Sequence, residues 1–460
     1  MLNRLRNLFG RRSYQAAGGG RRGESMHTMP APLSSVAVAR GPIAMRAKYA
    51  VGSNPLAAAG VQAWQTQAIG AGIVPASRHP DKSIREALTA RFSAWVDVAD
   101  DEGRTDWFGI QASLFRSMVT AGEGLALMLN TPEGLRLRVL DPEQLDTSHS
   151  ATLTSGRIVQ GVEFDNAGHR VAYWIFDHPL GLDFGIHRQR QRIPAEDVIH
   201  VFRQDWPGQV RGLSWFAPVL VRLTDLDSWR DGQLVRQKVA AFMTGFITSM
   251  DGSGSQMEGQ QKGSTITGAM TPGEMIYLDP GQDIKFSHPA QIGQDVIDFA
   301  SITEREVATG LGLPAHAFGD VTKANYSSLK QATTAWKARC EAIQWHCFIP
   351  QVCVPVWRRW ATLEVLSGRI QTTVELAMPV KHTTPRFADL EPVKTVTAEI
   401  MELEAGLTTR RALLAARGED VEQVDADLKE EQDRAKALGL TFGKPQPANE
   451  NEPPATAEAA

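Results

Sequence analysis

The sequence lacks the features that mark several classes of protein. It contains 3 cysteines in 460 residues, too few for a framework of disulfides, which favours a reducing compartment. It has no basic excess, because 48 Lys and Arg face 52 Asp and Glu, whereas proteins that grip nucleic acid usually carry surplus positive charge. A P-loop, a Gly-x-Ser-x-Gly elbow and a His-Glu-x-x-His pair are also missing. These absences argue against an NTPase motor and against the hydrolases that use those motifs.

The longest uncharged run does not qualify as a membrane span. Residues 49–77 carry no formal charge, but the run is interrupted by Gly70-Ala71-Gly72 and contains Gln62, Gln65, Thr66 and Gln67. Those side chains would take unsatisfied polar groups into lipid. We therefore predict a packed helix here and no membrane partner.

The N-terminus is basic. Residues 1–23 contain no acid and six arginines: Arg4, Arg6, Arg11, Arg12, Arg21 and Arg22. No apolar stretch follows, so the segment is not a secretory signal. We predict a mobile, solvated basic arm over residues 1–40, with a partner-binding arm as the alternative.

The first half of the chain changes from a helical to a strand pattern. Asn54 and Pro55 begin a helix that runs to Gly70, a second helix fits 84–98, and Asp106 caps a third that runs to 120. Short alternating runs then predict strands at 125–129, 135–140, 157–164, 171–176 and 199–202. The turn 165–168 indicates a hairpin. The fold class is therefore α+β, with a mainly antiparallel sheet.

The second half is mostly helical. We predict a nearly continuous helix over 215–248, a loop at 251–263, a turn-rich β segment at 270–287 and an amphipathic helix over 292–311. Another helix begins at Tyr326 and has two apolar rows, so it must be covered on more than one side; Pro350 and Pro355 kink or end it. Charged helical hairpins follow over 393–438, and residues 441–460 are expected to be disordered.

No group of residues in the sequence is a clear candidate for catalysis or metal binding. Cys340, Cys347 and Cys353 suit buried thiols better than a zinc site, because their spacing matches no common metal motif. Near Arg222 and Arg230 lie three acids, Asp225, Asp227 and Asp231, which fit a solvated ion-paired face or, alternatively, an acidic wall. We expect no catalytic residues, no cofactor and no metal, hence no enzyme.

Taken in order, several strings of the sequence resemble the portal (head–tail connector) proteins of lambda-like tailed bacteriophages. The most telling run is 207–215, Pro-Gly-Gln-Val-Arg-Gly-Leu-Ser-Trp. The others lie at 14–17, 54–55, 70–75, 161–165, 173–175, 198–202, 278–281, 325–328, 406–410 and 418–422. Together they cover roughly residues 10–440, nearly the whole chain.

The resemblance implies a function. Such proteins form a dodecameric ring at one capsid vertex, through which the terminase large subunit drives double-stranded DNA without sequence specificity and from which the DNA is later ejected. Further implied partners are the major capsid and scaffold proteins and the head-completion or tail-connector proteins. The implied location is the virion, and the host cytoplasm during assembly.

The resemblance also implies a division of the chain into named parts. These are a wing (41–212), a first stem helix (213–248), a clip (249–289), a second stem helix (290–314), a tunnel loop (315–325), a kinked helix with the wing return (326–390) and crown helices (391–440). A near-neutral or acidic channel wall would let DNA slide, because a strongly basic one would bind it tightly.

Two sets of residues are candidates for function. The tunnel loop would narrow the channel around DNA, and its polar residues Asp320, Thr322, Lys323 and Asn325 would lie there; alternatively, this is a surface loop in which Asn325 caps the next helix. Trp336 and Trp345, on the helix after Tyr326, are predicted to contact the neighbouring subunit, because an obligate interface resembles a core.

Two other classes of protein fit the sequence less well than a portal protein does. A different virion structural protein, such as a capsid or tail-tube subunit, is disfavoured by the long helices that flank a loop-rich insertion. A DNA-packaging enzyme would need a phosphate loop and acidic metal ligands, which the sequence does not contain.

Overall fold

The computed structural model describes residues 29, 31–179, 181, 188–241, 245–249, 260–262, 265–267, 282–286, 293–318, 325–385, 387, 391–417 and 421–440. Outside these ranges lie most of the predicted N-terminal arm, most of the loop predicted at 251–263, most of the β segment predicted at 270–287, and the tail after 440. The described residues fall into two compact units, Met1–His382 and Thr383–Ala460, and each is described by itself.

The first unit begins with helices whose ends follow from their caps. They are α2 (Pro32–Ser53), α3 (Pro55–Ala68), α4 (Lys82–Val96) and α5 (Trp107–Ala121). Asn54 caps α3 by accepting from the Ala57 amide, and Asp106 caps α5 by accepting from the Gly109 amide, which confirms both predicted starts. The predicted arm of residues 1–40 is too long, because residues 32–40 form the first turns of α2.

Two antiparallel sheets follow in the chain, where the alternating pattern predicts one. Strands β2 (Glu123–Thr131), β3 (Gly134–Leu140) and β9 (Val198–Phe202) form one, in the order β3-β2-β9. The other is a meander of β4 (Ala151–Leu153), β5 (Gly156–Val159), β6 (Val162–Asp165), β7 (Arg170–Phe176) and β8 (Arg190–Pro194). The single strand predicted at 157–164 is therefore two strands, which Gln160 and Gly161 separate with positive φ.

The core has a β part and an aromatic part. Between the sheets lie Leu125, Leu145, Val162, Phe164, Tyr173, Ile175 and Val198. The aromatic part joins the N-terminal helices to the later ones, as when Phe92 packs within 5.3 Å of both Trp357 and Trp360. Burial of such large rings provides much of the stability of a fold.

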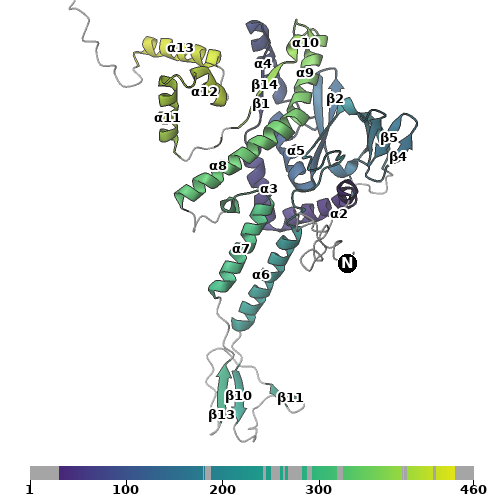
Figure 1. Ribbon diagram of the computed structural model, residues 1–460, viewed down its shortest axis with the longest axis vertical. Coiled ribbons are helices and arrows are strands. Elements are labelled where there is room, and N and C mark those ends of the chain that lie inside the picture. The colour runs from purple at the N-terminus through teal and green to yellow at the C-terminus, as the bar shows by residue number, and fades with distance from the viewer. Residues whose placement is uncertain are drawn as a thin grey trace, which may run out of the picture. The chain divides into compact units, whose positions relative to one another are not determined.

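After a run of turns the chain forms an antiparallel helix pair, α6 (Leu220–Ala241) and α7 (Gln294–Gly310) (Figure 1). The long helix predicted over 215–248 is shorter at both ends, because 215–219 form turns and 245–249 are a strand. That strand, β10 (Gly245–Ser249), pairs antiparallel with β13 (Gln282–Phe286), and β11 (Gln260–Lys262) pairs with β12 (Thr265–Thr267). The helix predicted over 292–311 is confirmed as α7.

The helix predicted from Tyr326 is long and changes its winding. It comprises α8 (Tyr326–Ile343), a π-helical stretch η5 (Gln344–Cys353) and α9 (Val354–Leu366). Pro350 lies within the π-helical stretch, and Pro355 is the second residue of α9. Neither proline ends the helix.

The unit closes with α10 (Val374–Ala377) and β14 (Val380–Thr383), which pairs with β1 (Val74–Ser77). Single turns at η2 (Pro142–Gln144), η3 (Ala195–Asp197) and η4 (Ala315–Phe318) connect the larger elements.

Among its described residues, the second unit has the helices α11 (Pro392–Glu404), α12 (Arg410–Arg417) and α13 (Val421–Leu438). Arg410 of α12 pairs with Asp425 of α13. The structure thus confirms the charged helical hairpins predicted over 393–438.

Candidate functional site

The helix pair α6/α7 is held by ion pairs and by one aromatic contact. Arg230 pairs with Glu304, and Arg222 lies 3.8 Å from Glu306. The rings of Trp229 and Phe299 also meet, with their centroids 5.0 Å apart. Sequence reasoning placed both arginines on an ion-paired face of their own helix, whereas the structure turns them toward the acids of the neighbouring helix.

Each helix of this pair also exposes apolar side chains. Leu234 and Val235 of α6 are exposed, and so are Ile297, Phe299 and Ile302 of α7. A monomeric soluble protein leaves few such side chains grouped on the same elements. The pair therefore has the surface of a subunit that packs against further protein.

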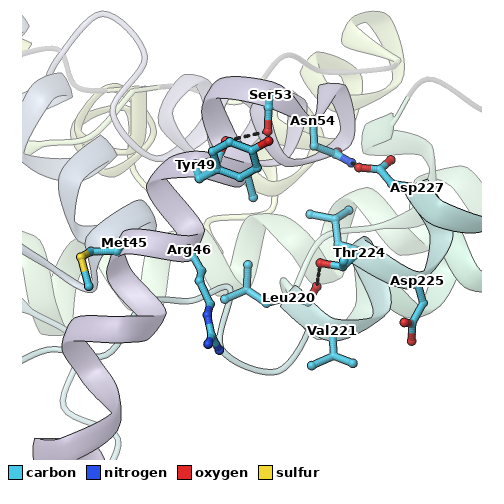
Figure 2. A pocket seen from close by; sticks show the side chains of 12 residues that line it. Met45, Arg46, Tyr49, Ser53, Asn54, Leu220, Val221, Thr224, Asp225 and Asp227 are labelled. Carbon is cyan, nitrogen blue, oxygen red and sulfur yellow. Dashed lines mark hydrogen bonds between the residues drawn. The ribbon is translucent and has the colours of Figure 1, made fainter.

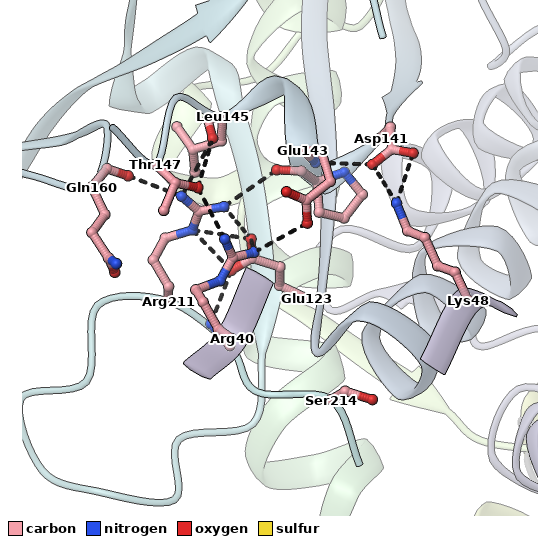
Figure 3. Close-up of polar contacts among 12 residues, drawn as sticks. Arg40, Lys48, Glu123, Asp141, Glu143, Leu145, Thr147, Gln160, Arg211 and Ser214 are labelled. Carbon is pink, nitrogen blue, oxygen red and sulfur yellow. Dashed lines mark hydrogen bonds and ion pairs between the residues drawn. The ribbon is translucent and has the colours of Figure 1, made fainter. Parts of the chain in front are cut away.

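A buried ionic cluster anchors the segment that leads into α6 (Figure 3). Its centre is Glu123 at the start of β2. The Glu123 carboxylate accepts from Arg40 Nη2 of α2 at 2.6 Å and from Arg211 Nε at 3.0 Å. It also accepts from the Gly212 amide at 2.9 Å and from His200 Nε2 at 3.0 Å.

The carboxylate at the centre of this cluster is ionised. Burial alone would raise the pKa of Glu123, but the Arg211 and Arg40 guanidiniums and the His200 hydrogen bond hold that pKa well below its usual range. Burial lowers the pKa of His200, against the opposing effect of Glu123, so the imidazole is neutral near pH 7 and Nε2 carries the donated proton. Glu123 is therefore an ionised acceptor between two buried cations.

Close backbone approach makes the cluster possible. Gly122 ends α5 with φ of +97°, and a Cβ at Gly212 would lie 2.0 Å from the Gly122 carbonyl oxygen. Only glycine at both positions lets the chain after Arg211 lie against the start of β2. Ser214 Oγ then donates to the Thr120 carbonyl at 2.6 Å. The start of the helix pair is thus fixed to α2, α5, β2 and β9.

Sequence reasoning did not find this cluster. Arg211 belongs to the quoted run 207–215 but received no role, and Arg40 and Glu123 were not singled out. The available signals were an arginine inside the mostly apolar α2 and a glutamate between two glycines. Neither signal identifies a partner, because the members are up to 171 positions apart in the chain.

The two tryptophans predicted at a subunit interface have different surroundings. Trp336 is 7% exposed, and its ring lies 6.5 Å from that of Trp64, centroid to centroid. Its apolar surface is therefore covered within the chain itself. Trp345 is 47% exposed and is the one available to a second copy.

Of the tunnel-loop candidates, only Asn325 lies within the described residues. Its side chain accepts from the Ser328 amide at 2.8 Å and caps α8, which is the alternative role weighed for it. Asp320, Thr322 and Lys323 fall outside the described residues.

The three cysteines are buried free thiols, as predicted. Burial raises the pKa of Cys340 to about 12 and that of Cys347 to about 11, so neither forms a thiolate readily. Across the ranges that the structure describes, no group of His, Cys, Asp and Glu is arranged to hold a metal ion. Within the same ranges, no helix is both long and apolar enough to cross a bilayer.

These features define a class before any comparison. The α+β unit of two sheets is joined through the Glu123 cluster to a helix pair, and the exposed apolar side chains of that pair are typical of a subunit that packs against other protein. The chain belongs to the lambda family of phage portal proteins, whose family model matches residues 19–344. Its function is accordingly that of a portal at the head–tail connection, and the family is a structural, non-enzymatic one.

Individual relatives agree with this assignment. The chain is 22% identical to a probable portal protein of Halomonas phage phiHAP-1, over 81% of this chain and 76% of that protein. It is 24% identical to the portal protein of Escherichia phage N15, over 86% of this chain and 84% of that protein. A solved chain from the neck of an empty GTA particle, computed with C6 symmetry, has a TM-score of 0.50 and 18% identity, and the match covers 84% of this chain and 93% of that one. The last likeness shows a shared fold.

Proposed function

We propose that twelve copies of this chain form a closed ring around an axial channel at one capsid vertex. The terminase large subunit drives double-stranded DNA inward through the channel, and the DNA later leaves through it toward the tail. The ring also contacts the major capsid and scaffold proteins and the head-completion proteins, and it assembles in the host cytoplasm before it becomes part of the virion.

The observation that carries the ring is the pair of apolar faces on α6 and α7. Leu234 and Val235 provide one surface and Ile297, Phe299 and Ile302 the other. Two different surfaces on one subunit suit a head-to-tail contact, in which α6 of one copy meets α7 of the next. Such a contact repeats from copy to copy and forms a ring when its rotation closes on itself.

The charge of the helix pair suits a DNA conduit. α7 has four acids, Asp295, Asp298, Glu304 and Glu306, against a single base, Arg305. Two of the cations of α6, Arg222 and Arg230, are already paired with α7. A wall with few available cations binds phosphate weakly, so DNA can slide along it.

The named parts of a portal subunit can be assigned to elements of this chain. We propose the wing for the two-sheet unit, the stem for α6 and α7, the clip for the strands between them, and the crown for α11–α13. The segment 315–325 that joins α7 to α8 is proposed as the tunnel loop. Its DNA contacts would come from Asp320, Thr322 and Lys323, since the Asn325 side chain caps α8.

Negative-stain microscopy of the purified full-length protein tests the ring. We expect particles with a central hole, and Ile302→Asp should abolish them because it places a charge in the apolar contact. Ile302→Leu is the matched control, because it keeps the apolar surface at the same position. Filaments or monomers from the unaltered chain, or unchanged rings with Ile302→Asp, would contradict the proposal.

A further inference from the structure

A mostly apolar groove of about 600 Å³ runs between α2 and α6 (Figure 2). Three of its lining side chains are large, apolar and strongly exposed: Met45 at 57%, Tyr49 at 77% and Val221 at 73%. On the α6 side it is bordered by Asp225 and Asp227, and on the α2 side by Arg46. The groove thus combines uncovered apolar surface with a net negative charge.

The N-terminal sequence has the complementary chemistry. Residues 1–12 read Met-Leu-Asn-Arg-Leu-Arg-Asn-Leu-Phe-Gly-Arg-Arg. Leu2, Leu5, Leu8 and Phe9 follow a spacing that would place them on one face of a helix, with Arg4 and Arg6 at its two edges. The segment contains no acid, and the family match begins only at residue 19.

We propose that residues 1–12 dock in the α2–α6 groove of their own chain as an amphipathic helix. The leucines and Phe9 would cover Met45, Tyr49 and Val221, while the arginines would lie near Asp225 and Asp227. Charge complementarity favours this occupant over a second copy of α7, because α7 has four acids and one base and would bring like charge to the acidic border.

The connecting chain is long enough for this arrangement. Along α2, Pro32 and Tyr49 are separated by about 26 Å at 1.5 Å per residue. Residues 13–31 can span up to about 60 Å when extended. The N-terminal segment can therefore return along α2 to the groove without strain, and its docking would clamp α2 to the first helix of the pair.

A binding measurement tests the groove. A fluorescently labelled peptide of residues 1–12 is added to a chain that lacks those residues, and its anisotropy is followed. We expect saturable binding, weakened at least fivefold by Asp225→Lys. Asp231→Lys is the matched control, because it makes the same charge change on α6 at a residue that does not line the groove.

Disulfide trapping tests whether the contact lies within one chain. Leu5→Cys and Val221→Cys are combined in the full-length protein and oxidised; the native thiols are buried and do not compete. We expect a cross-link within a chain that runs as a monomer on a denaturing gel. A cross-linked dimer would overturn the proposal in favour of a neighbouring copy. If the peptide does not bind, or if Asp225→Lys and Asp231→Lys weaken binding equally, then residues 1–12 do not dock in the groove. This outcome is independent of whether the protein forms rings.

Discussion

Replacing Glu123 by Gln tests whether the buried cluster holds the sheets to the helix pair. The substitution keeps the shape of the side chain but leaves Arg40 and Arg211 buried beside a neutral group. Removing one partner of a buried ion pair costs about 3–5 kcal/mol, because the remaining charge is uncompensated. Glu123 accepts from both arginines, from the Gly212 amide and from His200, so we expect a loss within that range.

The expected change in melting temperature follows from the size of the unit. An unfolding entropy of about 2.1 cal/mol/K per residue gives about 0.8 kcal/mol/K for a unit of 382 residues. A loss of about 3–5 kcal/mol then lowers Tm by about 4–6 °C. Calorimetry of both proteins at pH 7 measures this difference.

Glu143→Gln is the matched control. Glu143 Oε1 also lies near Arg40, at 3.8 Å, but it has no hydrogen-bond partner, so neutralising it should cost less than neutralising Glu123, which accepts several hydrogen bonds. If Glu123→Gln costs no more than Glu143→Gln, the cluster does not stabilise the junction and the reasoning is wrong.

Acid should reduce the difference between the unaltered protein and Glu123→Gln. Because the folded-state pKa of Glu123 lies below its unfolded value of about 4.3, its contribution is fully present above about pH 5. It is lost as pH falls further, since the unfolded chain takes up the proton first. The two melting temperatures should therefore converge below about pH 4.

Three further changes have distinct expected outcomes. Trp345→Asp should leave the fold intact but prevent ring formation in gel filtration, and intact rings would contradict the proposed interface. Trp336→Asp should instead lower the melting temperature, because Trp336 is buried within the chain. Lys323→Glu should leave ring assembly unchanged and reduce the packaged DNA recovered per particle, and full-length DNA at normal yield would argue against a tunnel loop at this position. Burial lowers the pKa of His382 to about 4. The free energy of unfolding should therefore fall by up to about 3 kcal/mol as pH drops from 6.5 to 4. Denaturant titrations of His382→Phe should lack this pH dependence.

Local features of the sequence were sufficient for many elements. Asn54 and Asp106 are caps that act within three residues, so the starts of α3 and α5 could be read directly. The alternation of apolar residues likewise predicted β2, β3, β7 and β9, because it reflects which face of a sheet is buried. Errors arose where a local pattern has two outcomes, as at 245–249, where an apolar run predicted as helix is a strand paired with 282–286.

The sequence by itself determined the α+β class, the order of elements and, through the order of its short strings, the portal family. Only the tertiary structure decided that Arg40, Glu123 and Arg211 meet, that Arg222 and Arg230 pair across to α7, and that Trp336 is covered while Trp345 is not. The physical reason is the distance along the chain over which each kind of interaction acts. Caps and periodicity act over a few residues, whereas ion pairing and burial depend on which distant segments the fold brings into contact, and neighbours in sequence carry no record of those partners.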